Sequence, residues 1–262
     1  MPAPRRVLVV GARGRMGEVV RAALAREPDL RLAAALELPG HPDLGQPLEH
    51  GVRLTDDPRA ALAGCDVAID FSAPDSTLAT LRLAAEAGVA YVTGTTGFSE
   101  TERAELARLA KSIAVIHAPN FSVAVNVLAW LVREAVRRLG PGYDAEILEL
   151  HHAAKRDAPS GTALRLAQSV AEGRGERSAS PLVLERAGET GARPAGAIGV
   201  QALRGGDNPG EHVVMLLGRG ERLELAHRAQ TRDHFAEGAV RAARWLAGRP
   251  PGLYPFEQVL GL

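Results

Sequence analysis

The chain has 262 residues, which is enough to bury one large core or two modest ones. Its 31 basic and 31 acidic side chains give a formal net charge of zero, so it offers no basic field to nucleic acid or to an anionic membrane. No apolar run approaches the roughly 20 residues of a membrane span, and the start MPAPRRVLVVGARG lacks the features of a secretory signal. Because the single cysteine, Cys65, excludes an internal disulfide, we expect a soluble cytoplasmic protein.

Short apolar runs alternate with segments of helical periodicity over the first 120 residues. The predicted strands are 6–10, 30–36, 66–72, 89–93 and 113–118, and the predicted helices are 15–26, 75–87 and 99–111. Such alternation is typical of a parallel sheet covered by helices on both faces. The sequence therefore predicts a doubly wound, Rossmann-type α/β domain over residues 1–121.

The rest of the chain has a different pattern. A helix at 122–139, a strand at 143–150 and a helix from about Ser160 to Ala171 are followed by strands at 181–186, 197–204, 212–217 and 222–228. Because Gly- and Pro-rich segments rather than helices separate the later strands, we expect a mixed, mostly antiparallel sheet. These elements predict a second, α+β domain over 122–230, and then a helix at 232–248 with a short tail, which form a C-terminal segment at 231–262.

A glycine-rich loop follows the first predicted strand and opens the first helix. It consists of Gly11, Ala12, Arg13, Gly14, Arg15, Met16 and Gly17, with GxxGxxG spacing. This is a variant of the dinucleotide fingerprint, in which glycines allow the backbone to approach a pyrophosphate at a helix N-terminus. Glu37 ends the second strand 20 residues past Gly17, where a carboxylate can accept hydrogen bonds from ribose hydroxyls. The alternative is a tight turn that binds no ligand.

Two further loops follow predicted strands. Gly94, Thr95 and Thr96 come after the fourth strand, and Ala118, Pro119, Asn120 and Phe121 come after the fifth. In a doubly wound sheet, ligands bind outside the carboxyl ends of the strands, so both loops are candidates for contact with the cofactor's nicotinamide half. Ordinary turn formation explains the same residue types equally well.

The stretch LELHHAAKRDAPSGTA, residues 148–163, holds one of only two lysines in the chain. His151 and His152 point to opposite sides of an extended segment, which disfavours a zinc site. Two histidines with Lys155 instead suggest proton donation and anion binding. Ser160 is a candidate N-cap that leaves the N–H groups of Gly161 and Thr162 for a carboxylate. The alternative is a capped helix beside a solvated histidine pair.

These motifs resemble the 4-hydroxy-tetrahydrodipicolinate reductase (dihydrodipicolinate reductase) family over nearly the whole chain. The shared segments include VVGARGRMG, DVAIDFSAP, GTTGF, APNFSVAVNV, ELHHAAKRDAPSGTAL and RGGDNPGEH. The resemblance implies that NAD(P)H delivers hydride to C4 of a cyclic unsaturated imine, formed when 4-hydroxy-tetrahydrodipicolinate loses its hydroxyl. The product would be tetrahydrodipicolinate, in diaminopimelate and lysine biosynthesis.

The resemblance also implies residue roles. His151 would be the general acid/base, and Lys155 a second proton donor that also neutralises a carboxylate. His152, Ser160, Gly161 and Thr162 would bind the substrate's two carboxylates. The cofactor would contact the segment from Gly11 to Met16, Glu37, Gly94, Thr95, Thr96 and the segment from Ala118 to Phe121. A homotetramer built through the second domain's sheet is implied too, with the C-terminal helix returning to the dinucleotide-binding domain.

One position departs from the family's pattern. Many members carry a basic residue directly after the ribose-binding acid, where it can pair with the 2′-phosphate of NADPH, whereas this chain has Leu38. We therefore expect NADH to be preferred and NADPH to be possible, since Arg13 or Arg15 could reach the phosphate instead. Two other hypotheses stay open: an NADH-sensing protein without turnover, and a dehydrogenase of another amino-acid-like imine.

Overall fold

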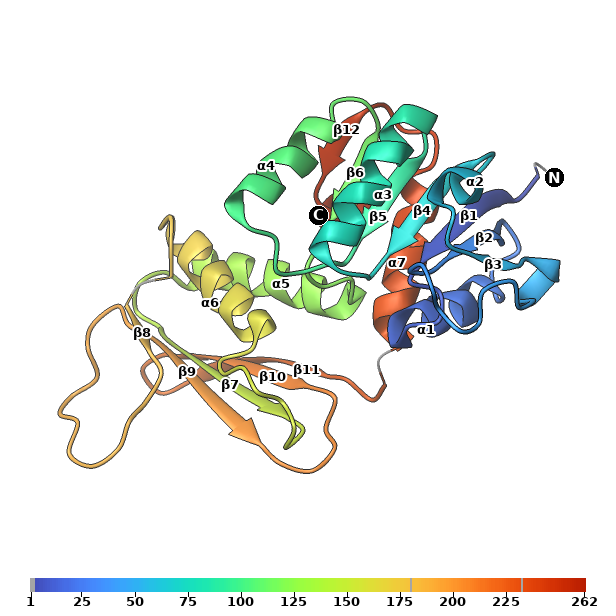
Figure 1. The fold of residues 1–262 in the computed structure, drawn as a ribbon. Helices are drawn as coiled ribbons and strands as arrows, with labels where there is room; N and C mark the ends of the chain where they lie inside the picture. Colours follow the sequence, from blue (N-terminus) through green and yellow to red (C-terminus); the bar gives the residue numbers. More distant parts are fainter. Residues whose placement is uncertain (1–2, 180, 232) are drawn as a thin grey trace. The chain divides into compact units, whose positions relative to one another are not determined.

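A computed structural model describes residues 3–179, 181–231 and 233–262 (Figure 1). The chain divides into two compact units. The first unit contains the residues up to Ser122 and those from Asp233 onward, and the second contains the described residues between them. Arg232, the expected first residue of the last helix, lies outside the described residues. Among the helices of the described residues, none is both long and apolar enough to cross a membrane.

The first unit is built on a seven-stranded parallel sheet in the order β12-β6-β5-β4-β1-β2-β3. The strands are β1 (Arg5–Val10), β2 (Leu30–Leu36), β3 (Leu54–Thr55), β4 (Val67–Asp70), β5 (Ala90–Thr93), β6 (Ala114–His117) and β12 (Gly252–Tyr254). From β3 to β6 the order is 3-2-1-4-5-6, which is the order of dinucleotide-binding sheets. The predicted doubly wound α/β fold is thus confirmed.

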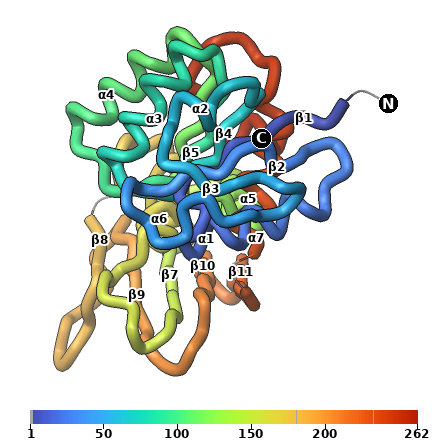
Figure 2. Tube along the Cα trace, turned by 45° about the vertical axis from the view of Figure 1, so that its right-hand side comes forward, coloured from blue at the N-terminus to red at the C-terminus, as the bar shows by residue number. Residues whose placement is uncertain are grey.

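Helices cover both faces of this sheet. They are α1 (Arg15–Leu24), α2 (Pro58–Leu62), α3 (Pro74–Ala87), α4 (Glu100–Leu109), α7 (Asp233–Leu246) and α8 (Phe256–Leu260), with a 3-10 turn at Glu49–Gly51. Leu81 of α3 and Leu106 of α4 pack on one face against Leu8 and Tyr91. α1 and α7 lie side by side on the other face (Figures 1 and 2). Segments from the two ends of the chain therefore complete one hydrophobic core.

The end of the chain is more ordered than the sequence suggested. In place of a short tail, residues 252–254 form β12, which pairs in parallel with β6 through Gly252 opposite Ala114 and Tyr254 opposite Ile116. A three-residue strand carries no measurable periodicity, so only the pairing with β6 reveals it.

The second unit places two helices on one face of a five-stranded sheet in the order β11-β10-β7-β9-β8. Its elements are α5 (Val123–Leu139), β7 (Asp144–His151), α6 (Gly161–Arg174), β8 (Leu182–Val183), β9 (Ile198–Arg204), β10 (Glu211–Leu217) and β11 (Arg222–Arg228). The sheet is mixed, as expected, but fewer of its strand pairs are antiparallel than predicted. Both β7 and β8 pair in parallel with β9. The reason is that α6 crosses over between β7 and the later strands, which makes a parallel pairing possible.

Close backbone packing fixes α7 in the first unit. A Cβ atom on Gly238 would lie 1.8 Å from the carbonyl oxygen of Phe121, so the helix can approach this closely only with glycine at that position. Phe121 is itself buried and makes edge-to-face contacts with Phe71 and Phe256, at ring-centroid distances of 5.8 and 5.0 Å. The segment after β6 and the C-terminal helices are therefore held in one rigid arrangement.

We expect Gly238→Ala to lower the melting temperature, although alanine normally stabilises a helix interior by about 0.5–1 kcal/mol relative to glycine. Overpacking against backbone costs about 1–3 kcal/mol, or several degrees for a protein of this size. Differential scanning calorimetry tests this. Gly142→Ala is the control, because a Cβ there meets no atom within 4 Å. A Gly238→Ala protein that melts at or above the wild-type temperature would contradict the packing argument.

Candidate active site

The glycine loop joins β1 to α1 through a tight turn. Gly11 has a positive φ of 67°, and a Cβ on Gly17 would lie 2.1 Å from the Gly11 carbonyl oxygen. The N-cap of α1 is Gly14, which has no side chain to bond to the first N–H groups of the helix. Such a bare, positively polarised helix end suits a pyrophosphate. The residues present therefore fit the phosphates of a dinucleotide.

The Glu37 carboxylate lies beside this loop. Its Oε1 accepts a hydrogen bond from the backbone N–H of Arg13 at 2.8 Å, and its Oε2 accepts one from the N–H of Leu38 at 3.2 Å. Leu38 is 63% exposed and offers no charge. Carboxylate oxygens held in this way can still accept hydroxyl hydrogens, which is what binding of an adenosine ribose requires.

The two arginines of the loop differ in their partners. Arg13 forms an ion pair with Asp43, with 3.0 Å between Nε and Oδ2. Arg15 is exposed, and no ion pair is seen for it within the described residues. Asp43 lies in the loop after β2, and the sequence alone did not single it out. Its charge offsets part of the positive potential that Arg13 would otherwise present to a phosphate.

The loops after β5 and β6 lie at the carboxyl edge of the same sheet. A Cβ on Gly94 would lie 2.0 Å from the Phe71 ring, and the buried Thr95 hydroxyl lies 2.8 Å from that of Thr77. Ala118 donates its N–H to the carbonyl of Thr93. Thr96 and Pro119 are exposed. Asn120 is half-buried and accepts a hydrogen bond from the N–H of Ser122. The Phe121 ring is part of the core. Buried Thr95 and Phe121 can therefore serve a ligand mainly through their backbone atoms.

In the second unit, polar side chains gather at the carboxyl end of β7. Glu149 and His151 are two residues apart in the strand, so they share its core-facing side, whereas His152 points the other way. His212 of β10 lies opposite Glu149, and Arg204 of β9 lies opposite His151. The sheet thus brings four functional side chains from three strands into one cluster.

The Glu149 carboxylate is at the centre of this cluster and is fully buried. Its Oε2 lies 2.8 Å from Nδ1 of His151. Its Oε1 accepts hydrogen bonds from the N–H of Ser160 and from Nη2 of Arg204, each at 3.0 Å. Arg204 Nη2 also donates to the carbonyl of Asp157 at 2.7 Å. One carboxylate therefore links β7, β9 and the start of α6.

Ser160 is the N-cap of α6, as the sequence predicted. Its hydroxyl accepts a hydrogen bond from the N–H of Ala163 at 3.1 Å and lies 3.1 Å from Nε2 of the buried His212. Gly161 and Thr162 follow as the first residues of the helix, exposed and half-buried respectively. The helix end is thus anchored on its inner side by Ser160 and open at Gly161, where an anion can approach.

Burial and charge set the protonation states of the cluster. Burial opposes ionisation of Glu149, but the hydrogen bonds from Ser160 and Arg204 outweigh it and lower the pKa of Glu149, which is therefore a carboxylate. Burial also lowers the pKa of His151, and the Glu149 charge acts against that decrease. Burial lowers the pKa of His212 to about 4, so this ring is neutral at pH 7.

Lys155 and His152 complete the candidate set. The Lys155 ammonium lies 2.7 Å from both carboxylate oxygens of Asp157, whose side chain is 64% exposed. His152 is half-buried, and its backbone N–H donates to the carbonyl of Asn208. Lys155 is thus held by an acid that a substrate carboxylate could replace.

Glu149, His151 and His212 also form the single group of three potential metal ligands found among the described residues, with ligand atoms within 4.8 Å of one another. However, Oε1 of Glu149 already accepts two hydrogen bonds, and the Arg204 guanidinium beside it repels a cation. The cluster therefore favours proton transfer over metal binding.

Sequence analysis did not identify Glu149, Arg204, His212, Asp157 or Asp43. Glu149 had a usable signal, because it lies two positions before His151 in a predicted strand and so shares its face. Arg204 and His212 lie on distant strands, and only the observed register brings them to the site.

Comparison with known proteins covers nearly the whole chain. The family model "Dihydrodipicolinate reductase, N-terminus" matches residues 5–121, and "Dihydrodipicolinate reductase, C-terminus" matches residues 124–260. The 4-hydroxy-tetrahydrodipicolinate reductase of Anaeromyxobacter dehalogenans (strain 2CP-1) is 47% identical, with 98% of each chain covered. That of Ralstonia pickettii (strain 12J) is also 47% identical, with 98% of this chain and 100% of the relative covered.

A solved structure shows the same relationship. The dipicolinate-bound dihydrodipicolinate reductase from Paenisporosarcina sp. TG-14 aligns with a TM-score of 0.80 at 26% identity, covering 96% of this chain and 97% of the other. The amine dehydrogenase of Mycobacterium smegmatis, at 17% identity and a TM-score of 0.58, shares the fold alone. The family models and the relatives agree along the chain, which belongs to the dihydrodipicolinate reductase family.

Proposed function

We propose that the protein reduces 4-hydroxy-tetrahydrodipicolinate, through its dehydrated cyclic imine, to tetrahydrodipicolinate in diaminopimelate and lysine biosynthesis. The observation that carries the proposal is the pairing of the buried His151–Glu149 couple with the open N-terminus of α6. A substrate with carboxylates that takes up a proton needs both features. The names of relatives 47% identical to the chain support the same reaction.

Each residue of the second unit then has a task. A bound nicotinamide cofactor would supply hydride. His151 would supply the proton, with the Glu149 carboxylate 2.8 Å from its Nδ1. The N–H groups of Gly161 and Thr162, with the Ser160 hydroxyl and His152, would bind the two carboxylates. Lys155 would exchange Asp157 for a substrate carboxylate and act as a second proton donor.

NADH is the cofactor we propose as preferred, with NADPH as a weaker alternative. The glycine loop and the Glu37 carboxylate support binding of a nicotinamide dinucleotide. Glu37 repels a 2′-phosphate, and Leu38 supplies no opposing charge. Arg13 is the nearest replacement, but Asp43 already pairs with it. Arg15 remains as the second source of positive charge.

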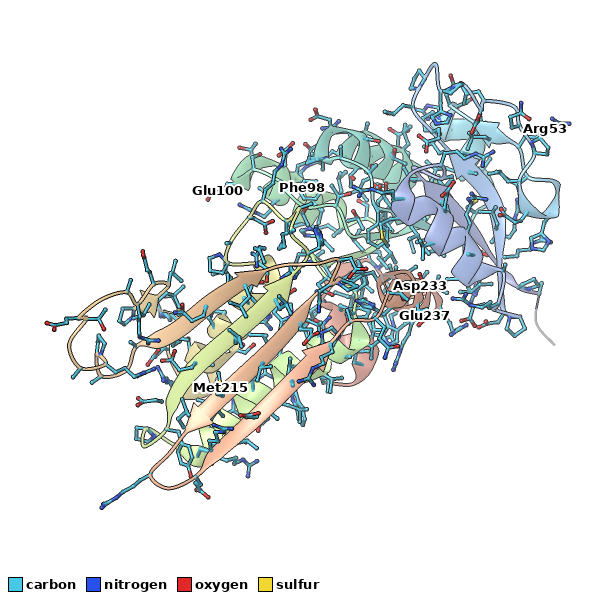
Figure 3. All side chains as sticks on the ribbon, turned by 90° about the horizontal axis from the view of Figure 1, so that it is seen from below. Arg53, Phe98, Glu100, Met215, Asp233 and Glu237 are labelled. Carbon is cyan, nitrogen blue, oxygen red and sulfur yellow. The ribbon has the colours of Figure 1, made fainter. Side chains whose placement is uncertain are left out.

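Self-association is also part of the proposal, as a homotetramer built through the second unit's sheet in the cytoplasm. Apolar side chains line the sheet face that points away from α5 and α6, seen in Figure 3 around Met215. The row comprises Leu148, Leu150, Leu203, Val213 and Met215. Leu203 is 49% exposed. An apolar face of this kind supports contact with a second copy of the chain.

A coupled assay tests the reaction. We expect NADH oxidation that depends on the condensation product of pyruvate and aspartate semialdehyde. His151→Gln should lower kcat by about 10²–10⁴, the usual effect of removing a positioned general acid. His50→Asn is the control, because His50 is exposed with a φ of 57°, a conformation that asparagine tolerates. Tight NADH binding without turnover of this product would favour a sensor.

Lys155→Arg separates proton donation from charge. We expect kcat/KM to fall by about tenfold or more, because a planar guanidinium cannot replace a compact ammonium as proton donor. Lys111→Arg, at the other and exposed lysine, should change nothing. Steady-state kinetics with varied substrate provide the measurement. Near-normal kcat/KM for Lys155→Arg would mean that Lys155 contributes its charge alone.

Cofactor titrations test the proposed preference. We expect a lower KM for NADH than for NADPH, with a gap that corresponds to one charge-assisted contact of roughly 1.5–3 kcal/mol, or about one to two decades. Leu38→Arg and Asp43→Asn should both lower KM for NADPH, the first by adding a cation and the second by releasing Arg13. Asp56→Asn removes an equal but exposed charge and is the control. A wild type that prefers NADPH would show that a loop arginine already holds the phosphate.

A further inference from the structure

We propose that Glu149 is a positioning residue for proton transfer: its buried carboxylate lies beside Nδ1 of His151 and stabilises the imidazolium, so that the ring holds the proton that it delivers. This inference rests on the proposed function, in which His151 is the proton donor. The 2.8 Å approach of Oε2 to Nδ1 is the observation behind it.

The strand geometry brings the two residues to the same face. Glu149 and His151 occupy successive core-facing positions of β7, and both side chains are buried. In an extended strand, residues two positions apart project from the same side of the sheet. The pair is therefore built into the backbone and does not depend on a loop.

Glu149 stays charged because its other oxygen is bound. Oε1 receives the Ser160 N–H and the Arg204 guanidinium at 3.0 Å each, and both donors favour the carboxylate. The same two donors leave Oε2 as the oxygen that faces His151. The approach of Oε2 to Nδ1 is a close charge contact and not an aligned hydrogen bond, since neither atom has a hydrogen-bond partner.

The Nε2 edge of His151 packs closely against the loop that precedes β10. A Cβ on Gly210 would lie 2.9 Å from Nε2 of His151, and Gly210 has a φ of 150°, which L side chains rarely adopt. The glycine that ends the GGDNPG segment therefore allows the ring edge to approach the backbone without a side chain between them.

The charges around His151 give Glu149 a distinct electrostatic role. Burial lowers the pKa of His151, and positive charge from Lys155, Arg204 and His152 lowers it further. Glu149 is the group that raises it. Across the cluster, His212 is neutral at pH 7 with its ring 5.2 Å from that of His151, and His227 lies beyond it on β11. Removing the Glu149 charge should therefore lower the pKa of His151.

The direction of the activity change follows. A proton donor must start protonated, which holds only below its pKa. In Glu149→Gln the pKa of His151 falls, so less of the enzyme is competent at neutral pH and activity begins to decline at a lower pH than in the wild type. The variant should thus recover relative activity as the pH is lowered.

Histidine-labelled NMR titration of the ligand-free protein is the first test. We expect the His151 titration to move to lower pH in Glu149→Gln, with the His151 signals assigned by their loss in His151→Gln. Glu146→Gln is the control, because Glu146 lies on the same strand, faces the other side and pairs with Arg186 and Arg193. Glu149→Asp keeps the charge, so its His151 should titrate at a pH between those of the wild type and Glu149→Gln. This variant serves as the test if Glu149→Gln does not fold.

Kinetics is the second test. We expect kcat of Glu149→Gln at pH 7 to fall by about 10–100-fold, the usual effect of losing a partner that orients a functional histidine. That deficit should shrink at lower pH, while KM for NADH should not change. The inference would be overturned by a kcat deficit of Glu149→Gln that does not depend on pH. It would also be overturned if the His151 titration were unchanged in Glu149→Gln, or shifted equally in Glu146→Gln. The NMR titration needs no substrate. If the His151 titration shifts in Glu149→Gln as expected but the wild type is inactive on the condensation product, only the proposed function is refuted.

Discussion

A carboxylate removed from water must recover its lost hydration from the protein, and Glu149 recovers it through two hydrogen bonds to one oxygen. The N-terminus of α6 contributes the Ser160 N–H and β9 contributes Arg204, while the His151 ring lies 2.8 Å from the other oxygen. None of these partners can move far without leaving a buried charge unsatisfied. The same carboxylate therefore sets where the start of α6 lies against the sheet and which charge faces His151.

Apolar packing places this polar cluster. On the core-facing side of β7, Ala145 and Ile147 precede Glu149, and the facing residues of β10 include Val214 and Leu216. Slipping the register by one residue would move this whole apolar row to the other face, so the hydrophobic core fixes the pairing. The position of His212 opposite Glu149 then follows from the same register. The geometry of the polar cluster in this unit is in that sense a consequence of core packing.

The sequence was informative wherever a pattern was local. Periodicity located the strands and helices of the first unit, and the glycine spacing located the turn before α1. Ser160 was predicted as an N-cap from its immediate neighbours, and the structure places it there. Pairings between distant segments were not predictable in the same way. β12 has three residues and is defined only by its neighbour β6, and Arg204 reaches the site only because β9 runs parallel to β7.

Burial separates the ion pairs of the candidate site into two kinds. Lys155 and Asp157 meet where Asp157 is 64% exposed, and an exposed pair contributes only about 0–1 kcal/mol, so a ligand carboxylate can take the place of Asp157 at little cost. Arg204 and Glu149 meet where Glu149 is fully buried, and separating them would leave an uncompensated charge, which is strongly destabilising. The exposed pair is thus suited to exchange with a ligand carboxylate, and the buried pair to holding Glu149 in place. A site that must release one carboxylate and retain another needs both kinds within a few residues of each other.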